Sequence, residues 1–365
     1  MKVLNLLTSG DAGGIESLCR DMGEKSTFEN GFCFLFRGGS TYEQMRQKGL
    51  KTYCFEQDSK KLNFHKYRKL KEIARGYDII VVHHGDPFLK LYYWLLSKSL
   101  KKKFVTYVHS CYEEKYFFHN NRIKKLLAHF MFQLGLDCSD RVIFVSEAGR
   151  RSYMSEFRIP DKKSVVVYNG IGLDKLIQGK EFQLSVEIPY NLTFIGRLSK
   201  EKGLNNLLAA SAVLRKKYDI KLSIVGKGEE RVALEQLAEK LNIKDIVEFY
   251  GEQQDITPFL KSASIFIYPS VFQEVFGIAI VEAMAFGIPC VAYAVGGIPE
   301  IVEDRKTGYL ANTISVLSLS EKIEEAIKDI RSGAVCNISE QAKEKAESFS
   351  IGITVDKLKR IYDCM

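Results

Sequence analysis

Residues 264–293, SIFIYPSVFQEVFGIAIVEAMAFGIPCVAY, contain one complete strand–helix–strand pattern. The apolar run 264–268 predicts a buried strand, and a Pro-Ser turn follows it. Residues 277–286 have the length and composition of a short helix, and the apolar run 289–293 predicts the next strand. This order indicates a parallel βαβ unit, the building block of doubly wound α/β folds.

The same region is also the one that could be mistaken for a membrane span. Glu282 is the only charged residue between positions 275 and 299. Glycine and proline residues break the segment, whereas a spanning helix needs about 20 largely apolar residues. The sequence therefore predicts no transmembrane segment. Residues 1–7 are too short for a signal-peptide core and predict a first buried strand.

The rest of the chain repeats this alternation in two series. The first series has candidate strands at 3–8, 32–36, 51–55, 78–83, 103–109, 141–146 and 164–168. The second has them at 191–196, 221–226, 247–250, 264–268 and 289–293. Two such series predict two Rossmann-like domains that face each other across a cleft. We expect domains at 1–172 and 190–345, a linker at 173–189, and a C-terminal helix at 346–365 that could pack back on the first domain.

Charge and cysteine content narrow the class of protein. The 365 residues carry a net charge of +8, distributed as +12 over residues 1–180 and −4 over residues 181–365. The basic half could meet nucleic acid or anionic lipid, or the charge could serve solubility. Because no nucleic-acid-binding motif is present, we expect no nucleic-acid partner. The eight scattered cysteines indicate neither a zinc site nor a disulfide framework, which suits the cytoplasm.

Two glutamates stand out at the turn and helix of the first quoted segment. Glu274 precedes the predicted helix, and Glu282 lies about two turns inside it. The start of a helix next to Gly277 offers free N–H groups and a partial positive charge, which suit a phosphate. Glu282 is too far along the helix for that phosphate but can accept hydrogen bonds from vicinal hydroxyls. Two ordinary glutamates that flank a buried helix are the alternative.

A basic turn follows the first strand of the second series, in the segment FIGRLSKEKG at 194–203. Gly196 allows the backbone to turn at the strand end. Arg197 supplies a planar fork of donors, and Lys202 supplies a point charge five residues later. This pair suits a diphosphate, although a solvated basic turn is the alternative.

Together these two segments resemble retaining glycosyltransferase family 4, the glycosyl transferases group 1 with the GT-B fold, of the bacterial surface-polysaccharide type. The resemblance implies that Glu282 binds the nucleotide ribose and that Glu274 contacts hydroxyls of the transferred sugar. It implies that Arg197 and Lys202 neutralise the departing diphosphate. It also implies that the backbone amides between the two glutamates contact the donor, at Phe276, Gly277 and Ile278.

Weaker signals complete the implied site. Gly226 and Gly251 stand in turns that line the nucleotide cleft in this family, although plain β–α turns explain them equally well. Gly13 and Gly14 resemble the family's N-terminal Gly-Gly loop near the sugar and phosphates. His109 ends a predicted strand, where the family commonly has a histidine that contacts the transferred sugar. His83 and His84 also end a strand and are weaker candidates.

The resemblance implies an N-terminal acceptor-binding domain, a C-terminal nucleotide-sugar-binding domain and a transfer that retains the anomeric configuration. The sequence contains no Asp-x-Asp and no His/Cys cluster with metal spacing, so we expect no metal and no cofactor. The expected partners are a nucleotide sugar donor and a glycan or lipid-linked acceptor.

An anionic membrane surface is a further candidate partner, at the inner face of the plasma membrane. Residues 88–103 and 122–134 combine apolar and basic side chains, as interfacial helices do. The alternative is that both segments pack on the sheet. Two other functions stay open at this stage: a GT-B nucleotide-sugar epimerase and a catalytically silent transferase partner.

Overall fold

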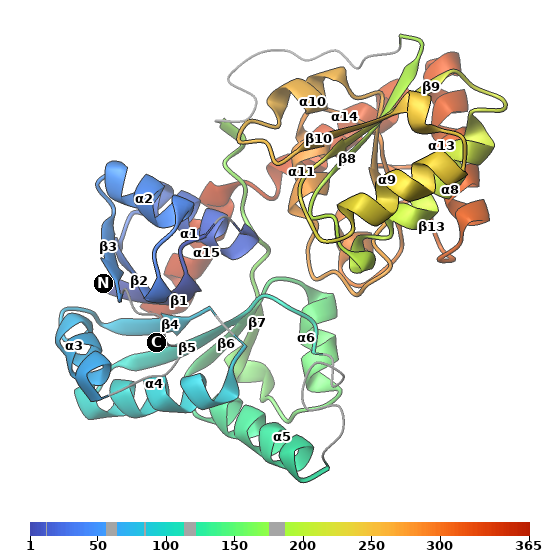
Figure 1. Ribbon diagram of the computed structural model, residues 1–365. Coiled ribbons are helices and arrows are strands. Elements are labelled where there is room, and N and C mark those ends of the chain that lie inside the picture. The colour runs from blue at the N-terminus through green and yellow to red at the C-terminus, as the bar shows by residue number, and fades with distance from the viewer. Residues whose placement is uncertain (12, 56–63, 84, 113–121, 175–186) are drawn as a thin grey trace. The chain divides into compact units, whose positions relative to one another are not determined.

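The computed structural model describes residues 1–365 except 12, 56–63, 84, 113–121 and 175–186. The chain divides into two compact units. The first contains Met1–Ile171 and Ile351–Met365, and the second contains Gly172–Ser350. Each unit is a parallel sheet with helices on its faces, which confirms the predicted pair of Rossmann-like folds (Figure 1).

The first unit has a seven-stranded sheet in the order β3-β2-β1-β4-β5-β6-β7. Its strands are β1 (Lys2–Ser9), β2 (Glu29–Arg37), β3 (Lys51–Cys54), β4 (Ile79–Val82), β5 (Lys103–Val108), β6 (Arg141–Phe144) and β7 (Ser164–Val166). Every pairing is parallel. The order reverses between β1 and β4, and the carboxyl ends of strands at such a reversal form a usual ligand-binding crevice.

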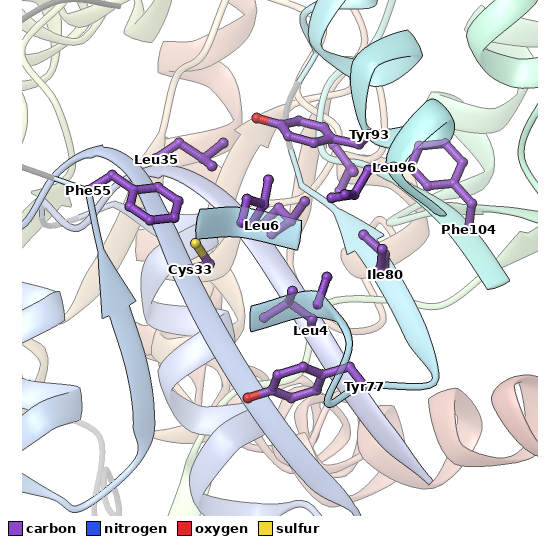
Figure 2. Close-up of a cluster of buried hydrophobic side chains, with 13 residues drawn as sticks. Leu4, Leu6, Cys33, Leu35, Phe55, Tyr77, Ile80, Tyr93, Leu96 and Phe104 are labelled. Carbon is purple, nitrogen blue, oxygen red and sulfur yellow. The ribbon is translucent and has the colours of Figure 1, made fainter. Parts of the chain in front are cut away.

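Helices cover both faces of this sheet: α1 (Gly14–Lys25), α2 (Ser40–Gln47), α3 (Phe64–Ala74), α4 (Pro87–Leu100), α5 (Arg122–Asp137), α6 (Glu147–Met154) and α15 (Ile351–Asp363). Figure 1 shows α1, α2 and α15 on one face and α3, α4 and α5 on the other. Alternate residues of β1 face opposite layers, as the period of two requires. Leu4 and Leu6 pack with Tyr93, Leu96 and Phe104 (Figure 2). Leu7 packs with the α1–α2 layer.

The last helix completes the first unit rather than the second. Thr354 donates a hydrogen bond to the carbonyl oxygen of Tyr168 at 3.0 Å, and Tyr362 meets Phe28 edge to face. The predicted start of this helix at residue 346 is wrong. Helix α14 (Val335–Glu347) belongs to the second unit, where Phe349 packs against Phe276 with ring centroids 5.4 Å apart. The chain therefore leaves the second unit only after Phe349. Most of the predicted linker lies outside the described residues.

The second unit has a six-stranded parallel sheet in the order β10-β9-β8-β11-β12-β13. Its strands are β8 (Tyr190–Ile195), β9 (Ile220–Val225), β10 (Val247–Gly251), β11 (Ile265–Tyr268), β12 (Cys290–Tyr293) and β13 (Tyr309–Ala311). Its α-helices, besides α14, are α8 (Leu204–Leu214), α9 (Arg231–Lys240), α10 (Thr257–Ser262), α11 (Ile278–Ala285), α12 (Ile298–Ile301) and α13 (Val316–Ser332). The strand order reverses between β8 and β11. The basic turn with Lys202 begins at the carboxyl end of β8, and the Pro-Ser turn that leads to Glu274 begins at the carboxyl end of β11.

Candidate active site

The basic turn after β8 and the Pro-Ser turn after β11 are locked together. A short 3₁₀ turn, Lys200–Lys202, ends at Gly203, whose φ of +64° is in the left-handed region that favours glycine. A Cβ atom at Gly203 would collide with the carbonyl oxygen of Pro269. The N–H of Val271 donates to the carbonyl oxygen of Glu201 at 2.9 Å. The adjacent parallel strands β8 and β11 therefore place Lys202 beside residues that follow it by about 70 positions.

Lys202 is the centre of a polar network at this point. Its Nζ donates to Glu274 Oε1 at 2.5 Å and to the hydroxyl of Tyr268 at 2.7 Å. The hydroxyl of Ser270 donates to the same Glu274 oxygen at 2.8 Å. The Lys202 and Glu274 side chains are only 20% and 15% exposed. The structure thus brings these two predicted site residues into direct contact.

The ionisation of Lys202 follows from these neighbours. Burial by itself lowers the pKa of Lys202, but Tyr268 and Glu274 outweigh it and the net pKa is raised. Burial raises the pKa of Tyr268 to about 12, so its hydroxyl stays protonated at neutral pH. Lys202 is therefore a fixed positive charge that a bound ligand could share with Glu274.

The other predicted donor-binding residues of the second unit lie after β8 and at α11. Arg197 follows β8 and is exposed. Hydrogen bonds to the Glu201 carboxylate are the main cause that lowers the pKa of Glu201, and the positive charge of Arg197 lowers it further. Glu282 is partly buried on α11. Three residues form the entry to α11: Phe276, Gly277 and Ile278. The start of a helix carries N–H groups that point away from the helix body.

Two predicted glycines hold neighbouring strand ends close together. The N–H of Gly226, after β9, donates to the carbonyl oxygen of Gly251, the last residue of β10, at 2.8 Å. Gly226 has a φ of +138°, and a Cβ there would collide with the carbonyl oxygen of Gly196. The backbone at Gly226 is accordingly restricted to glycine by packing within the fold, so this position needs no ligand to explain it.

In the first unit, the carboxyl ends of β1, β4 and β5 carry the remaining predicted residues. Gly13 and Gly14 open α1, and the Glu16 carboxylate occupies the space that a Cβ of Gly13 would need. Gly13 has extended backbone with a φ of −165°, which any residue adopts, and the flexible Glu16 side chain could move aside for a Cβ there. His109 follows β5, and His83 follows β4. His84 lies outside the described residues.

His83 and His109 form a hydrogen-bonded pair. Asn5 Nδ2 donates to Asn30 Oδ1 at 3.1 Å, so Asn5 Oδ1 is left to accept from His83 Nε2, 3.0 Å away. With Nε2 protonated, a neutral His83 presents Nδ1 as an acceptor, and it lies 3.0 Å from Nε2 of His109. His109 must then donate through Nε2, which leaves its Nδ1 able to accept a hydrogen bond from a ligand. His83 is 2% exposed and therefore orients His109 from beneath.

Burial lowers the pKa of His109 to about 3, well below its usual value near 6.5. The folded protein keeps this ring neutral, whereas the unfolded chain takes up a proton below pH 6.5. The free energy of unfolding should therefore fall as pH drops from about 6.5 toward 4, by up to about 1.4 kcal/mol per pH unit. We expect His109→Gln to flatten this dependence in urea titrations. Equal slopes for the two proteins would contradict a neutral His109 in the folded protein.

Sequence reasoning missed several residues that build the site. Tyr268 and Ser270 complete the Lys202–Glu274 network, and Asn5 fixes the tautomer of His83. The N–H of Gly297 donates to the carbonyl oxygen of Glu274 at 2.6 Å and supports the loop from below. Tyr268 and Ser270 occupy a strand end and a turn, a position that signals a site residue. Asn5 lies inside a strand and gives no such signal.

Comparison with known proteins identifies the family. Residues 32–175 match the model of Glycosyltransferase Family 4, and residues 180–348 match the model of Glycosyl transferases group 1. The chain belongs to glycosyltransferase family 4. This glycosyltransferase is similar to an uncharacterised glycosyltransferase of Haemophilus influenzae, with 25% identity over 98% of both chains.

Two further comparisons place the glycosyltransferase among its relatives. It is 28% identical to the N-acetyl-α-D-glucosaminyl L-malate synthase of Bacillus anthracis, over 80% of this chain and 77% of that one. Its fold matches the crystal structure of Anabaena Alr3699/HepE with a TM-score of 0.84, 23% identity and full coverage of both chains. The predicted GT-B fold and transferase activity are thereby confirmed.

Proposed function

We propose that this glycosyltransferase moves a sugar, with retention of configuration, from a nucleotide diphosphate sugar to a glycan or lipid-linked acceptor in cell-surface polysaccharide synthesis. The observation that carries the proposal is the Lys202–Glu274 contact at the carboxyl ends of β8 and β11. The Anabaena protein of the same fold has been crystallised with UDP and with UDP-glucose. These complexes support a nucleotide diphosphate sugar as the donor.

The chemistry follows from charge that develops on the leaving group. When the bond from the anomeric carbon to the diphosphate breaks, negative charge accumulates on the diphosphate oxygen. Arg197, Lys202 and the first N–H groups of α11 would stabilise that charge in place of a divalent ion. The acceptor hydroxyl attacks from the same face, and its proton passes to the departing diphosphate oxygen. This front-face route needs no protein nucleophile.

The hydroxyl groups of the donor have separate partners in this proposal. Glu274 would accept hydrogen bonds from hydroxyls of the transferred sugar when Lys202 also binds the diphosphate. Glu282 would accept from the ribose. His109 would accept through Nδ1, the atom that its bond to His83 leaves open. These contacts position the anomeric carbon for attack.

The direct test is incubation of the purified protein with a panel of nucleotide sugars in EDTA. A transferase without its acceptor should release the nucleoside diphosphate slowly from one donor. An epimerase would instead convert the nucleotide sugar without releasing the diphosphate. A silent partner would leave every donor unchanged, and that outcome would contradict the proposed transfer.

We also propose that the first unit binds an anionic membrane surface through an apolar strip of α5. Helix α5 buries Ala128, Phe132 and Leu136. Three of its apolar residues nevertheless stay 72%, 50% and 60% exposed: Leu126, Leu127 and Phe130. None of the described helices has both the length and the apolar character needed to cross a bilayer. Exposed Lys125 next to the strip supports contact with an anionic rather than a neutral surface.

The double variant Leu126→Gln, Phe130→Gln should reduce sedimentation with anionic lipid vesicles by about tenfold or more, because each side chain loses burial in the membrane. Leu317→Gln is the matched control, since Leu317 is a similarly exposed leucine (68%) on a helix of the second unit. Equal sedimentation of wild type and double variant at low salt would contradict this membrane site.

A further inference from the structure

Lys90 is a buried lysine that none of the roles above uses. It lies in the first turn of α4 and is only 1% exposed. Its Nζ sits 5.4 Å from the ring centroid of Phe132 on α5, and its aliphatic chain passes over Gly135. Lysine is almost never buried in this way unless its charge has a partner.

Among the described residues, no carboxylate lies within ion-pairing distance of Lys90. The charge of Asp86 acts on Lys90, but the Asp86 carboxylate accepts the N–H of Leu89 at 3.0 Å at the start of α4. Burial lowers the pKa of Lys90 to about 8, and Asp86 only partly opposes this shift. Lys90 is therefore still mostly protonated at neutral pH. A buried cation without an anion is costly unless a ligand supplies one.

Lys90 borders a cavity of about 220 Å³ at the carboxyl ends of β4 and β5. The cavity is also lined by His83, His109, Ser110 and Tyr153, and none of the lining residues that the structure describes is acidic. It has room for roughly seven water molecules at about 30 Å³ each. Drug-sized ligands need about 300–1,000 Å³, so this space suits one substituent of a substrate.

We propose that Lys90 binds an oxyanion, a carboxylate or a phosphate, carried by a substrate of the transfer reaction. This inference rests on the proposed function, because it places the oxyanion beside His109. The donor diphosphate already has Arg197 and Lys202 in the second unit. The oxyanion therefore belongs to an acidic acceptor, and an acidic donor sugar is the other source that the test must separate. Ser110 and Tyr153 offer hydroxyl donors for its remaining oxygens.

Calorimetric titration with inorganic phosphate and with L-malate tests this site. Lys90→Met should weaken binding of at least one probe by about tenfold or more, the value of one charge-assisted hydrogen bond. Lys98→Met, at an exposed lysine of the same helix, should leave binding unchanged. Lys90→Met should stay folded, because replacing a buried charge by an apolar side chain is often neutral or stabilising.

Two additional arms separate the possible outcomes. Because phosphate could also bind at Lys202, the titrations are repeated in Lys202→Ala, where the effect of Lys90→Met must persist. Binding of UDP-glucuronate is compared with binding of UDP-glucose. If Lys90→Met weakens only the binding of UDP-glucuronate, the oxyanion belongs to the donor sugar. The inference is overturned if wild type binds neither probe below about 10 mM, or if Lys90→Met binds both as wild type does. A titration with UDP alone tests the donor binding of the proposed function independently of Lys90.

Discussion

Lys202→Ala is expected to lower kcat by about 10- to 150-fold. The lysine would form a charge-assisted hydrogen bond to a diphosphate whose charge grows in the transition state, and such a bond contributes about 1.5–3 kcal/mol. Because the interaction strengthens as the bond breaks, KM should change less than kcat. Arg197→Ala should act in the same direction, since its guanidinium would bind the same leaving group.

Lys200→Ala is the matched control for this experiment. Lys200 begins the same 3₁₀ turn and is exposed, whereas Lys202 contacts Glu274 and Tyr268. Steady-state kinetics on the donor found in the panel should therefore show near wild-type turnover for Lys200→Ala. If Lys202→Ala and Arg197→Ala also turned over at the wild-type rate, the diphosphate role of both residues would be wrong.

Gly203→Ala is expected to lower the free energy of unfolding by about 2–5 kcal/mol. An alanine at φ +64° costs about 1–2 kcal/mol of backbone strain. Its Cβ would also collide with the carbonyl oxygen of Pro269, and relief of that overlap would cost about 1–3 kcal/mol more. The collision would push apart the two turns that bring Lys202 to Glu274.

Gly333→Ala provides the control for strain alone. Gly333 caps α13 with a φ of +81°, and a Cβ there would have no neighbour within 4 Å. Urea unfolding should show a loss of only about 1–2 kcal/mol for this variant. Equal losses at Gly203 and Gly333 would mean that the packing of the two turns adds nothing to stability.

The fold was largely predictable because buried strands of a parallel sheet are short, apolar and separated by helices. Each predicted strand corresponds to an observed one, usually ending one or two residues earlier. Strand β13 was not predicted, since it has only three residues and follows a polar turn. The helix boundary at 346 was wrong because burial of Phe349 in the second unit gives no local signal.

The site was predictable where residues follow strand ends, and less so where contacts are long-range. Glu274 and Lys202 could each be named from local motifs, but their direct contact spans 72 positions. Both His83 and His109 end predicted strands, so the preference for His109 came from the family resemblance. The structure shows that the two rings act as a pair, with His83 buried beneath His109. Lys90 gave no signal, because a lysine in an apolar helix resembles a surface residue.

The central claim is that the second unit binds the donor diphosphate through Lys202 without a metal ion. Calorimetric titration of the preferred nucleoside diphosphate and of its parent nucleoside, both in EDTA, tests it most directly. We predict that the diphosphate binds wild type at least tenfold more tightly than the nucleoside does, and that Lys202→Ala loses most of this difference. If the diphosphate and the nucleoside bind wild type equally well, or if Lys202→Ala keeps the full difference, the claim is wrong.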